Sequence, residues 1–477
     1  MLPIYVFAQS WGYSNNDFGT ALCKSDDNIF ITGFTKLDKI QNSDDVFILK
    51  LNLNSGKYIF KTFNYKYNDR AYGISMINKN IIISGESFCG FGNIYGRENG
   101  FVLNLSQNFY IKDKIVPYFT ARDAFLKTKE LSNGDLLSVG YSRTFNTGLH
   151  SIGDVFILKT SPNFDTLWHK AYYSAGNDYC ADFVELQNRD IVLLTNIGGF
   201  VNSNQADYRY TKDSQIGFIK IDEDANELER ILWGGEGHDF ASEIIKSPDN
   251  SGYYIVGSTQ SFGNGNFDVL LLKVDNNFNE IWYKTFGDTS FDYGKSIVYS
   301  NIDQHLYLLS SESNPKTKEV KTVLYNLDLD GNVIDTQEFK LNKYTYAANL
   351  IVDKDGKLYI LGNCYENRND VNMFLLSHNP NDSEENFFFK KLLVKVFPNP
   401  VLAGNELFFQ LQNFNFNTEK SIKISISDLS GRLLLTKEVT TFKQFSINTS
   451  GFKKGMYFYS IQFDKFDYLF GKFLVEE

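Results

Sequence analysis

Short apolar runs recur between residues 17 and 377 and are separated by turn residues. In the stretch 233–286, a first run is followed by a tight turn, a second run that ends at Gly257, a polar loop, the run VLLLKV, and a fourth run that carries Trp282. Runs of four to eight residues bounded by Gly, Pro, Asn and Asp are typical of β-strands. Four such strands predict one small antiparallel sheet, which cannot bury both of its faces alone.

This unit repeats along the chain with three markers in register: an aspartate (a threonine in the seventh copy) ahead of the first strand, a small residue in the second strand, and a third strand resembling DVFILK. The first markers, spaced 52 to 61 residues apart, are Asp17, Asp69, Asp123, Asp178, Asp239, Asp292 and Thr345. The second markers are Gly33, Gly85, Gly140, Thr195, Gly257, Ser310 and Gly362. A long fixed period indicates a solenoid, propeller or array, and four strands per copy favour the propeller. The sequence therefore predicts an all-β chain with a seven-bladed β-propeller.

The repeat predicts the propeller at residues 10–380, followed by a linker at 381–393. Residues 1–9 are either a truncated signal-peptide remnant or part of the strand that closes the ring. In register with the copies, residues 4–11 align with a fourth strand and would complete the seventh blade. Residues 385–391 follow the last third strand at the usual distance and are the alternative.

A different strand pattern occupies residues 394–477. Several short alternating runs are separated by turn residues, which predicts a small antiparallel, Ig-like β-sandwich. Motif residues occur along it in a characteristic order: Pro398, Asn399, Pro400, Asp428, Gly431, Arg432, Gly455, Tyr457 and Lys472.

On these residues, the segment resembles the C-terminal sorting domain of type IX (Por) secretion substrates of Bacteroidetes-type bacteria. The resemblance implies export across the inner membrane, recognition by the type IX secretion machinery, and a secreted or outer-membrane cell-surface location. It also implies removal of the domain, often with attachment to a surface lipopolysaccharide. Phe452 departs from the leucine that is usual in the family. The region 17–377 resembles the secreted propeller-repeat proteins that often precede such domains, a resemblance that implies fold and not activity.

Composition narrows the class of partner. The formal net charge is −10, the pI is about 5.2, and no block of Lys and Arg occurs. Nucleic acid and anionic membrane surfaces are therefore poor partners. No apolar run approaches the ~18 residues that span a bilayer, so no transmembrane segment is expected.

Catalytic and metal motifs are not recognisable in the sequence. The four cysteines form no C-x-x-C pair; Cys23 and Cys89 lie in neighbouring copies and either pair or stay as buried thiols. The repeated Asp45, Asp154 and Asp268 are interpreted as loop-capping carboxylates. The Asp-rich stretch that begins at Asp222 fails the spacing of a calcium loop and is interpreted as a turn. We expect no catalytic residue, no metal and no cofactor.

Long loops after the second strands carry the remaining functional signal. They occupy 86–98, 141–153 and 196–214, and by the alternating topology all emerge on one face of the ring. Exposed aromatic and Arg side chains on a rigid scaffold are good anchors for proteins or glycans. The predicted binding residues are Tyr95, Arg97, Arg143, Phe145, Tyr208 and Tyr210.

These features favour an exported, non-enzymatic, monomeric propeller that binds a protein or glycan. The alternative is a propeller hydrolase or lyase that acts on extracellular polysaccharide. Convergent acidic and histidine side chains near the axis would favour the enzyme, and a broad aromatic surface would favour the binder.

Overall fold

The structure is a computed structural model of the whole chain. It describes residues 6–7, 16–36, 43–55, 58–63, 68–88, 98–116, 122–143, 153–173, 176–198, 214–365, 371–378, 393–412, 422–428, 432–439, 444–462 and 468–476.

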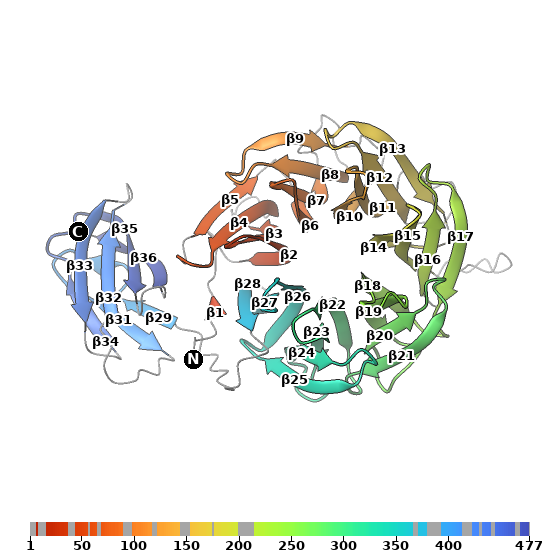
Figure 1. Cartoon of the computed structure of the whole chain (residues 1–477). Coiled ribbons are helices and arrows are strands. Elements are labelled where there is room, and N and C mark those ends of the chain that lie inside the picture. The colour runs from red at the N-terminus through yellow and green to blue at the C-terminus, as the bar shows by residue number, and fades with distance from the viewer. Residues whose placement is uncertain are drawn as a thin grey trace, which may run out of the picture. The chain divides into compact units, whose positions relative to one another are not determined.

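Each copy of the repeat forms four antiparallel strands (Figure 1), and a single parallel bridge between Val320 and Tyr344 joins the sixth and seventh copies into one eight-stranded sheet. Blade 1 is β2 (Asp17–Ser25), β3 (Asn28–Thr35), β4 (Asp45–Asn52) and β5 (Tyr58–Phe63). Blade 2 is β6 (Asp69–Ile77), β7 (Asn80–Phe88), β8 (Glu98–Leu105) and β9 (Ile111–Ile115). Blade 3 is β10 (Asp123–Glu130), β11 (Leu136–Ser142), β12 (Asp154–Thr160) and β13 (Thr166–Tyr172). Blade 4 is β14 (Tyr179–Glu185), β15 (Ile191–Ile197), β16 (Gln215–Ile221) and β17 (Glu227–Trp233).

The remaining blades follow the same order. Blade 5 is β18 (Asp239–Lys246), β19 (Tyr253–Thr259), β20 (Asp268–Val274) and β21 (Glu280–Phe286). Blade 6 is β22 (Asp292–Ser300), β23 (His305–Ser313), β24 (Val320–Leu327) and β25 (Val333–Phe339). Blade 7 is β26 (Tyr344–Val352), β27 (Leu358–Tyr365), β28 (Asn372–His378) and β1 (Val6–Phe7). The seven-bladed propeller expected from the sequence is thus confirmed.

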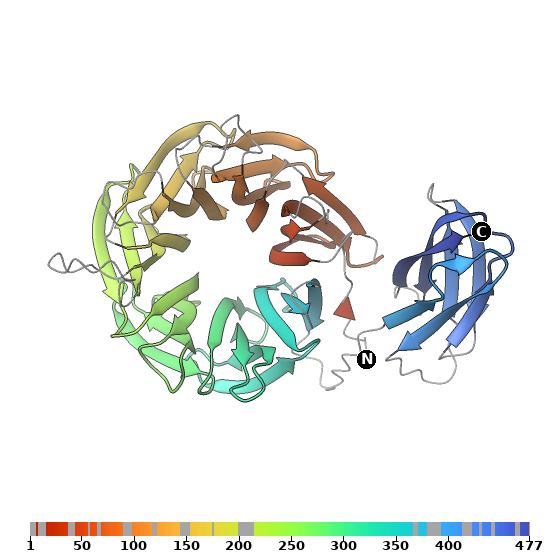
Figure 2. The same ribbon diagram turned by 180° about the vertical axis from the view of Figure 1, so that it is seen from behind.

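The seven sheets stand radially around an axis, with each first strand innermost and each fourth strand at the rim (Figures 1 and 2). We call the end of the ring where second strands connect to third strands the loop face. Adjacent blades bury their apolar faces against each other, so that Leu137 of blade 3 and Leu193 of blade 4 share one core cluster. This packing supplies the burial that a single four-stranded sheet lacks.

The N-terminus closes the ring. Val6 pairs with Leu376 and Phe7 pairs with Leu375, so β1 is the fourth strand of blade 7. This pairing corresponds to the first of the two segments considered above, and 385–391 lies outside the described residues. On the loop face, the Asp17 N–H donates to the Val371 carbonyl at 2.9 Å. The two ends of the repeat are therefore joined by backbone pairing both at the rim and on the loop face.

The need for a small residue at the second-strand marker has a local structural cause. All seven innermost strands shift register three residues after the first marker, as a β-bulge does. The bulge brings an inner-strand carbonyl against the second strand: a Cβ added at Gly257 would lie 1.9 Å from the Phe240 oxygen, and one at Gly33 would lie 1.8 Å from the Phe18 oxygen. Glycine permits this close approach.

The C-terminal unit is a separate two-sheet sandwich. Its strands are β29 (Leu393–Phe397), β30 (Val401–Leu402), β31 (Glu406–Gln412), β32 (Ile422–Ser427), β33 (Leu433–Val439), β34 (Gln444–Asn448), β35 (Gly455–Gln462) and β36 (Tyr468–Glu476). One sheet has the order β29-β31-β34, and the other has the order β30-β36-β35-β32-β33. Phe409 and Tyr459 contribute one ring from each sheet to the core, with centroids 5.1 Å apart. The expected sandwich is confirmed.

Candidate functional site

Of the binding residues predicted from the long loops, one lies in the described part of the chain. Tyr95, Arg97, Phe145, Tyr208 and Tyr210 lie outside the described residues. Arg143 is described, and its side chain is exposed at the loop-face end of blade 3. Its backbone N–H donates to the Arg122 carbonyl at 2.9 Å. Its role as a binding residue stays a prediction.

Five aromatic rings from blades 5 and 6 form a continuous surface on the loop face, which we call the aromatic platform: His238, Phe240, Phe267, Phe291 and Tyr293. His238 stacks on Phe240 with a centroid distance of 6.0 Å, and Phe240 lies 5.9 Å from Phe267. Phe267 in turn lies 5.5 Å from Tyr293 and 6.3 Å from Phe291. Phe291 is 45% exposed and the other four are half-buried, so the rings are accessible to a ligand.

Backbone hydrogen bonds fix the chain segments that carry these rings. The Asp292 N–H donates to the Phe267 carbonyl at 2.8 Å, which joins blade 6 to blade 5. The Gln260 N–H donates to the His238 carbonyl at 2.8 Å. Because the backbone is already held, little ordering entropy is lost when a ligand binds.

The repeated aspartates hold the same loops. Asp268 accepts the Gly265 N–H at 2.9 Å, and Asp239 accepts the Gly235 N–H at 2.9 Å. Asp292 accepts two N–H groups, from Asp288 at 2.8 Å and from Ser313 at 3.0 Å. The Asp268 contact supports the interpretation of that carboxylate as a structural cap, and Asp239 and Asp292 cap loops at the first-marker position in the same way.

The pKa of the capping Asp292 carboxyl group is raised. Burial is the largest influence and raises the pKa of Asp292 to about 6, while the N–H groups of Asp288 and Ser313 oppose that rise. The negative charge of Glu312 adds to it. The platform thus rests on a carboxylate whose ionised form is disfavoured.

A cluster of paired charges lies on blades 1, 2 and 3, at the base of two of the predicted loops. Its members are Asp44, Arg70, Tyr72, Glu86, Arg122 and Tyr141. The buried Glu86 carboxylate accepts hydrogen bonds from Tyr72 at 2.6 Å, Tyr141 at 3.0 Å and Arg122 at 3.2 Å. Arg70 lies 2.6 Å from Asp44 and 3.5 Å from Glu86. We call this the arginine–glutamate cluster.

The two arginines of the cluster have carboxylate partners. Burial alone would lower the pKa of Arg70, but the hydrogen bond and the charge of Asp44 outweigh it and raise the pKa. Burial, followed by the charge of Glu86, raises the pKa of the Tyr72 phenol. With both cations already paired, the described part of this cluster is a structural ion network.

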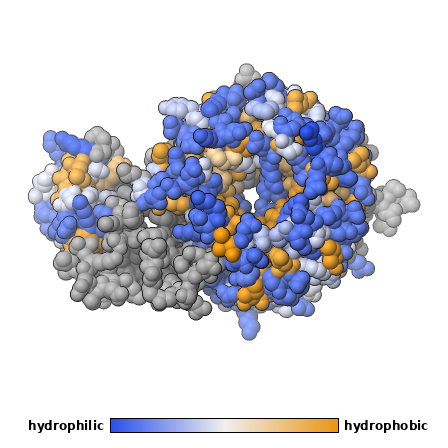
Figure 3. Space-filling model, in the orientation of Figure 1, coloured by the Kyte–Doolittle hydropathy of each residue, from blue (hydrophilic) through white to orange (hydrophobic). Residues whose placement is uncertain are grey.

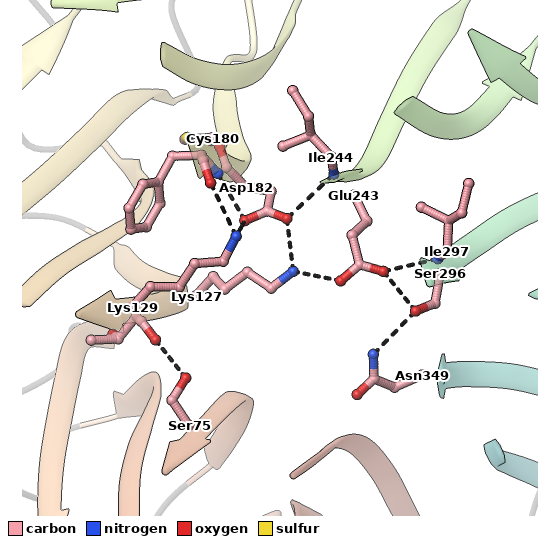
Figure 4. Close-up of polar contacts among 12 residues, drawn as sticks. Ser75, Lys127, Lys129, Cys180, Asp182, Glu243, Ile244, Ser296, Ile297 and Asn349 are labelled. Atoms are coloured by element: carbon pink, nitrogen blue, oxygen red, sulfur yellow. Dashed lines mark hydrogen bonds and ion pairs between the residues drawn. The ribbon is translucent and has the colours of Figure 1, made fainter. Parts of the chain in front are cut away.

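A second polar network follows the innermost strands around the axis (Figure 4). Lys127 of β10 donates to Asp182 of β14 and to Glu243 of β18, each at 2.9 Å. The second Glu243 oxygen accepts the Ser296 hydroxyl of β22 at 2.6 Å. Asn349 of β26 lies 3.4 Å from that hydroxyl. These five residues, which we call the channel network, each directly follow the bulge of their strand.

Charges in the channel network compensate one another. Burial would lower the pKa of Lys127, but the carboxylates of Asp182 and Glu243 outweigh it and raise the pKa. Burial would raise the pKa of Asp182, but Lys127 and Lys129 outweigh it and lower the pKa. The network therefore carries fixed charges across blades 3, 4 and 5.

Sequence reasoning missed the platform and both networks, although the repeat holds a signal for them. Arg70 is the only charged residue directly after a first marker, where other copies have Phe, Tyr or Ala. Glu86 is the only charged residue directly after a second marker. Three consecutive copies carry a charge four residues after the first marker: Lys127, Asp182 and Glu243. Departures from the repeat thus locate the polar clusters.

No metal site is evident in the part of the chain that the structure describes. No group of three or more His, Cys, Asp or Glu side chains there could hold a metal ion. The Asp222 carboxylate accepts the N–H groups of Asp224 at 3.0 Å and Asn226 at 2.8 Å, which makes it a turn cap. Cys23 and Cys180 are free thiols, and Cys89 lies outside the described residues.

The sorting-motif residues occupy turns and strand ends of the sandwich. Asn399 accepts the N–H of Leu474 at 2.9 Å and so joins the Pro398–Pro400 turn to β36. Asp428, directly after β32, accepts the Arg432 N–H at 3.1 Å.

The later motif residues lie on β35 and β36. The Tyr457 ring is buried 4.9 Å from Phe452 and 5.5 Å from Phe473. Gly455 begins β35, and Lys472 is exposed on β36 opposite Phe458. Gly431 lies outside the described residues.

The family model described as the secretion system C-terminal sorting domain matches residues 395–476. The chain is a β-propeller protein sorted by type IX secretion. Its destination is the cell surface or the extracellular space, because that is where this domain directs proteins. No curated protein matches the sequence of this type IX substrate.

Solved structures with a related arrangement of strands share little sequence with this type IX substrate. The Pan2 WD40 domain of Neurospora crassa is 11% identical, with a TM-score of 0.44 over 76% of this chain and 90% of that one. The β-propeller domain of the Trilobed protease from Pyrococcus furiosus is 10% identical, with a TM-score of 0.42 over 79% and 99%. The polysaccharide lyase Uly1 is 12% identical, with a TM-score of 0.45 over 78% and 93%. These likenesses concern the fold and not an activity.

The described surface of the propeller is mainly hydrophilic on the side shown in Figure 3, with hydrophobic residues gathered beside its hollowed centre. Among the described residues, no helix has the length and apolar character to cross a membrane.

Proposed function

We propose that the protein is an exported, non-enzymatic propeller that binds an extracellular glycan or protein on its loop face. The observation that carries this proposal is the aromatic platform. Its rings are exposed or half-buried, lie within 6.3 Å of their neighbours, and stand on backbone that is hydrogen-bonded between blades. Aromatic faces bury large apolar area and stack on the apolar faces of sugar rings or on side chains.

The state of the channel carboxylates supports binding over catalysis. Asp182 and Glu243 are both hydrogen-bonded to Lys127 at 2.9 Å. A catalytic acid or base needs a pKa near the working pH, usually through burial or a like charge. The lysine pairing acts in the opposite direction on Asp182 and holds it ionised.

The test removes the most exposed platform ring from the full-length exported protein. Phe291→Ala should weaken binding on a glycan array or to a purified extracellular protein ligand about fivefold, the loss expected for one aromatic contact. Tyr110→Ala is the matched control, because Tyr110 is 70% exposed and lies between β8 and β9 on the opposite face. Unchanged binding by Phe291→Ala would contradict the proposal, as would release of oligosaccharide products from a polysaccharide by the wild-type protein.

Sorting by the C-terminal unit has its own test. Deletion of residues 394–477 should leave the propeller inside the cell, because the recognised domain is lost. Unchanged appearance of the truncated protein in the medium would refute the role of the motif residues.

A further inference from the structure

Lys295 occupies an unusual position at the edge of the platform. It is the bulge residue of β22, the innermost strand of blade 6, where the other blades have uncharged residues. Those other bulge residues are Thr20, Tyr72, Leu126, Ala181, Ser242 and Ala348. Its side chain is exposed, and its Nζ atom lies 5.7 Å from the centroid of the Tyr293 ring. The ammonium group therefore stands beside a platform ring on the channel side of the blade.

This ammonium group has no counter-charge among the described residues. No hydrogen bond or ion pair joins Lys295 to a carboxylate there, whereas Lys127 is bonded to Asp182 and Glu243. Burial lowers the pKa of Lys295, and no neighbouring charge opposes that effect. The side chain is reached by water yet surrounded by protein, as expected for a residue that lines a channel.

The combination of ring faces and an unpaired cation defines the chemistry of a ligand. Aromatic rings pack on the C–H faces of sugars, and an ammonium group that lacks a partner attracts an anionic substituent. The local field is weakly screened because protein atoms replace water around the channel. A neutral sugar would contact only the rings, and a simple anion would contact only the ammonium group, so a sugar that carries an acidic group is the ligand that uses both.

We propose that the platform and Lys295 together bind an anionic polysaccharide, with a sugar ring on Tyr293 and Phe291 and the acidic group of that sugar on the Lys295 ammonium. This inference rests on the proposed function and specifies its ligand class. The acidic group is a carboxylate, as in a uronic acid, or a sulfate ester, since both offer charged oxygens to one amine. Lys295 supplies the preference for acidic over neutral glycans, and the rings supply the affinity that both kinds of glycan have in common.

The experiment measures calorimetric binding of the full-length protein to three probes: oligogalacturonates, sulfated galactose oligomers and neutral galactose oligomers of equal length. At least one acidic probe should bind about tenfold more tightly than the neutral one, the difference expected for a hydrogen bond to a charged group. Lys295→Met should abolish this preference and leave neutral binding unchanged, and Lys295→Arg should retain it. Lys246→Met is the matched control, because Lys246 is exposed at the opposite end of an innermost strand.

The outcomes separate this inference from the proposed function. Equal binding of acidic and neutral probes, or an acidic preference that survives Lys295→Met, overturns the inference while the platform still binds glycans. Loss of binding to all three probes in Phe291→Ala supports the platform as the glycan-binding surface, whether or not the wild-type protein prefers the acidic probes. Absence of binding to every probe by the wild-type protein overturns the anionic-glycan assignment, and the Phe291→Ala comparison with a protein ligand then decides the proposed function separately.

Discussion

The channel network and the aromatic platform share the innermost strands β18 and β22, but their lysines differ in whether they have an acidic partner. Lys127 directly follows the bulge of β10 and is bonded to two carboxylates from the next two blades. Lys295 is the bulge residue of β22 and has a ring as its described neighbour. A lysine whose ammonium group is paired with carboxylates of other blades stabilises the fold, whereas a lysine without an acidic partner is available to bind a ligand.

The largest effect should follow from breaking the channel network. Asp182→Ala removes a buried carboxylate and leaves Lys127 and Lys129 without their shared partner. Because both lysines are partly exposed, we expect a loss at the lower end of the range for a broken buried ion pair, about 3 kcal/mol of unfolding free energy. Urea unfolding followed by tryptophan fluorescence checks it, since the four Trp, at 11, 168, 233 and 282, all precede the sandwich.

The matched control is a carboxylate on the rim. Glu223 is 50% exposed and lies 4.0 Å from Arg189, so Glu223→Ala should change stability by less than about 0.5 kcal/mol. The pKa of Asp182 is lowered by folding, so its contribution is present above the pKa of the unfolded chain and is lost as the pH falls. Equal unfolding midpoints for Asp182→Ala and wild type would show that the network does not hold the blades.

A smaller loss should come from the bulge beneath the platform. A Cβ at position 257 would lie 1.9 Å from the Phe240 oxygen, so Gly257→Ala must displace the strand that carries a platform ring. We expect a loss of about 2 kcal/mol together with weaker ligand binding. At Gly153 the nearest atom to an added Cβ lies 3.7 Å away, and Gly153→Ala should be tolerated in the same assay. Similar midpoints for the two variants would contradict this explanation of the glycine marker.

The pH dependence of the unfolding free energy should reflect the titration of the Asp292 carboxyl group. Folding raises its pKa to about 6, so the folded protein binds the extra proton and the stabilisation is complete below the pKa of the unfolded chain. That stabilisation, of order 2 kcal/mol, is lost as the pH rises through about 6. Asp292→Asn should flatten the slope between about pH 4 and pH 6. A wild-type slope in the variant would mean that another group titrates there.

The smallest change in stability should come from Lys295, where the predicted effect on binding is large. Lys295→Met removes no ion pair among the described residues, so the unfolding free energy should change by less than about 0.5 kcal/mol. The two variants should therefore differ in which measurement changes: Asp182→Ala lowers the unfolding free energy, and Lys295→Met abolishes the preference for acidic ligands. The comparison fails if Lys295→Met unfolds as readily as Asp182→Ala.

Much of the fold was predictable because the repeat carries local rules. The markers at Asp239, Gly257 and Asp268 predict a blade because each has one local role. Asp239 caps a loop, Gly257 leaves space at a bulge, and Asp268 caps the loop before the third strand. The strand at Val6–Phe7 was not decided by such rules, since two segments matched the same pattern. Pairing with β28 depends on where the chain ends meet in space.

The candidate site was less predictable. Reasoning from loop length pointed to blades 2, 3 and 4, whereas the described rings gather on blades 5 and 6 around Phe267. Phe240, Phe267 and Phe291 are separated by whole strands, and each one alone resembles an ordinary strand-flanking apolar residue. Their contact across a blade boundary is not visible in a one-dimensional pattern.

The amino-acid sequence by itself determined the number of blades, the β-sandwich that follows them and the export address, because strand periodicity, turn residues and sorting motifs are local and repeat in order. Tertiary structure alone decided which charges pair and which do not. Lys127 and Lys295 are inner-strand lysines that lie one position apart in the repeat, and the placement of Asp182 and Glu243 beside Lys127 gives it the acidic partners that Lys295 lacks among the described residues. Electrostatic partners depend on distances of a few ångströms between residues more than fifty positions apart, and folding alone sets those distances.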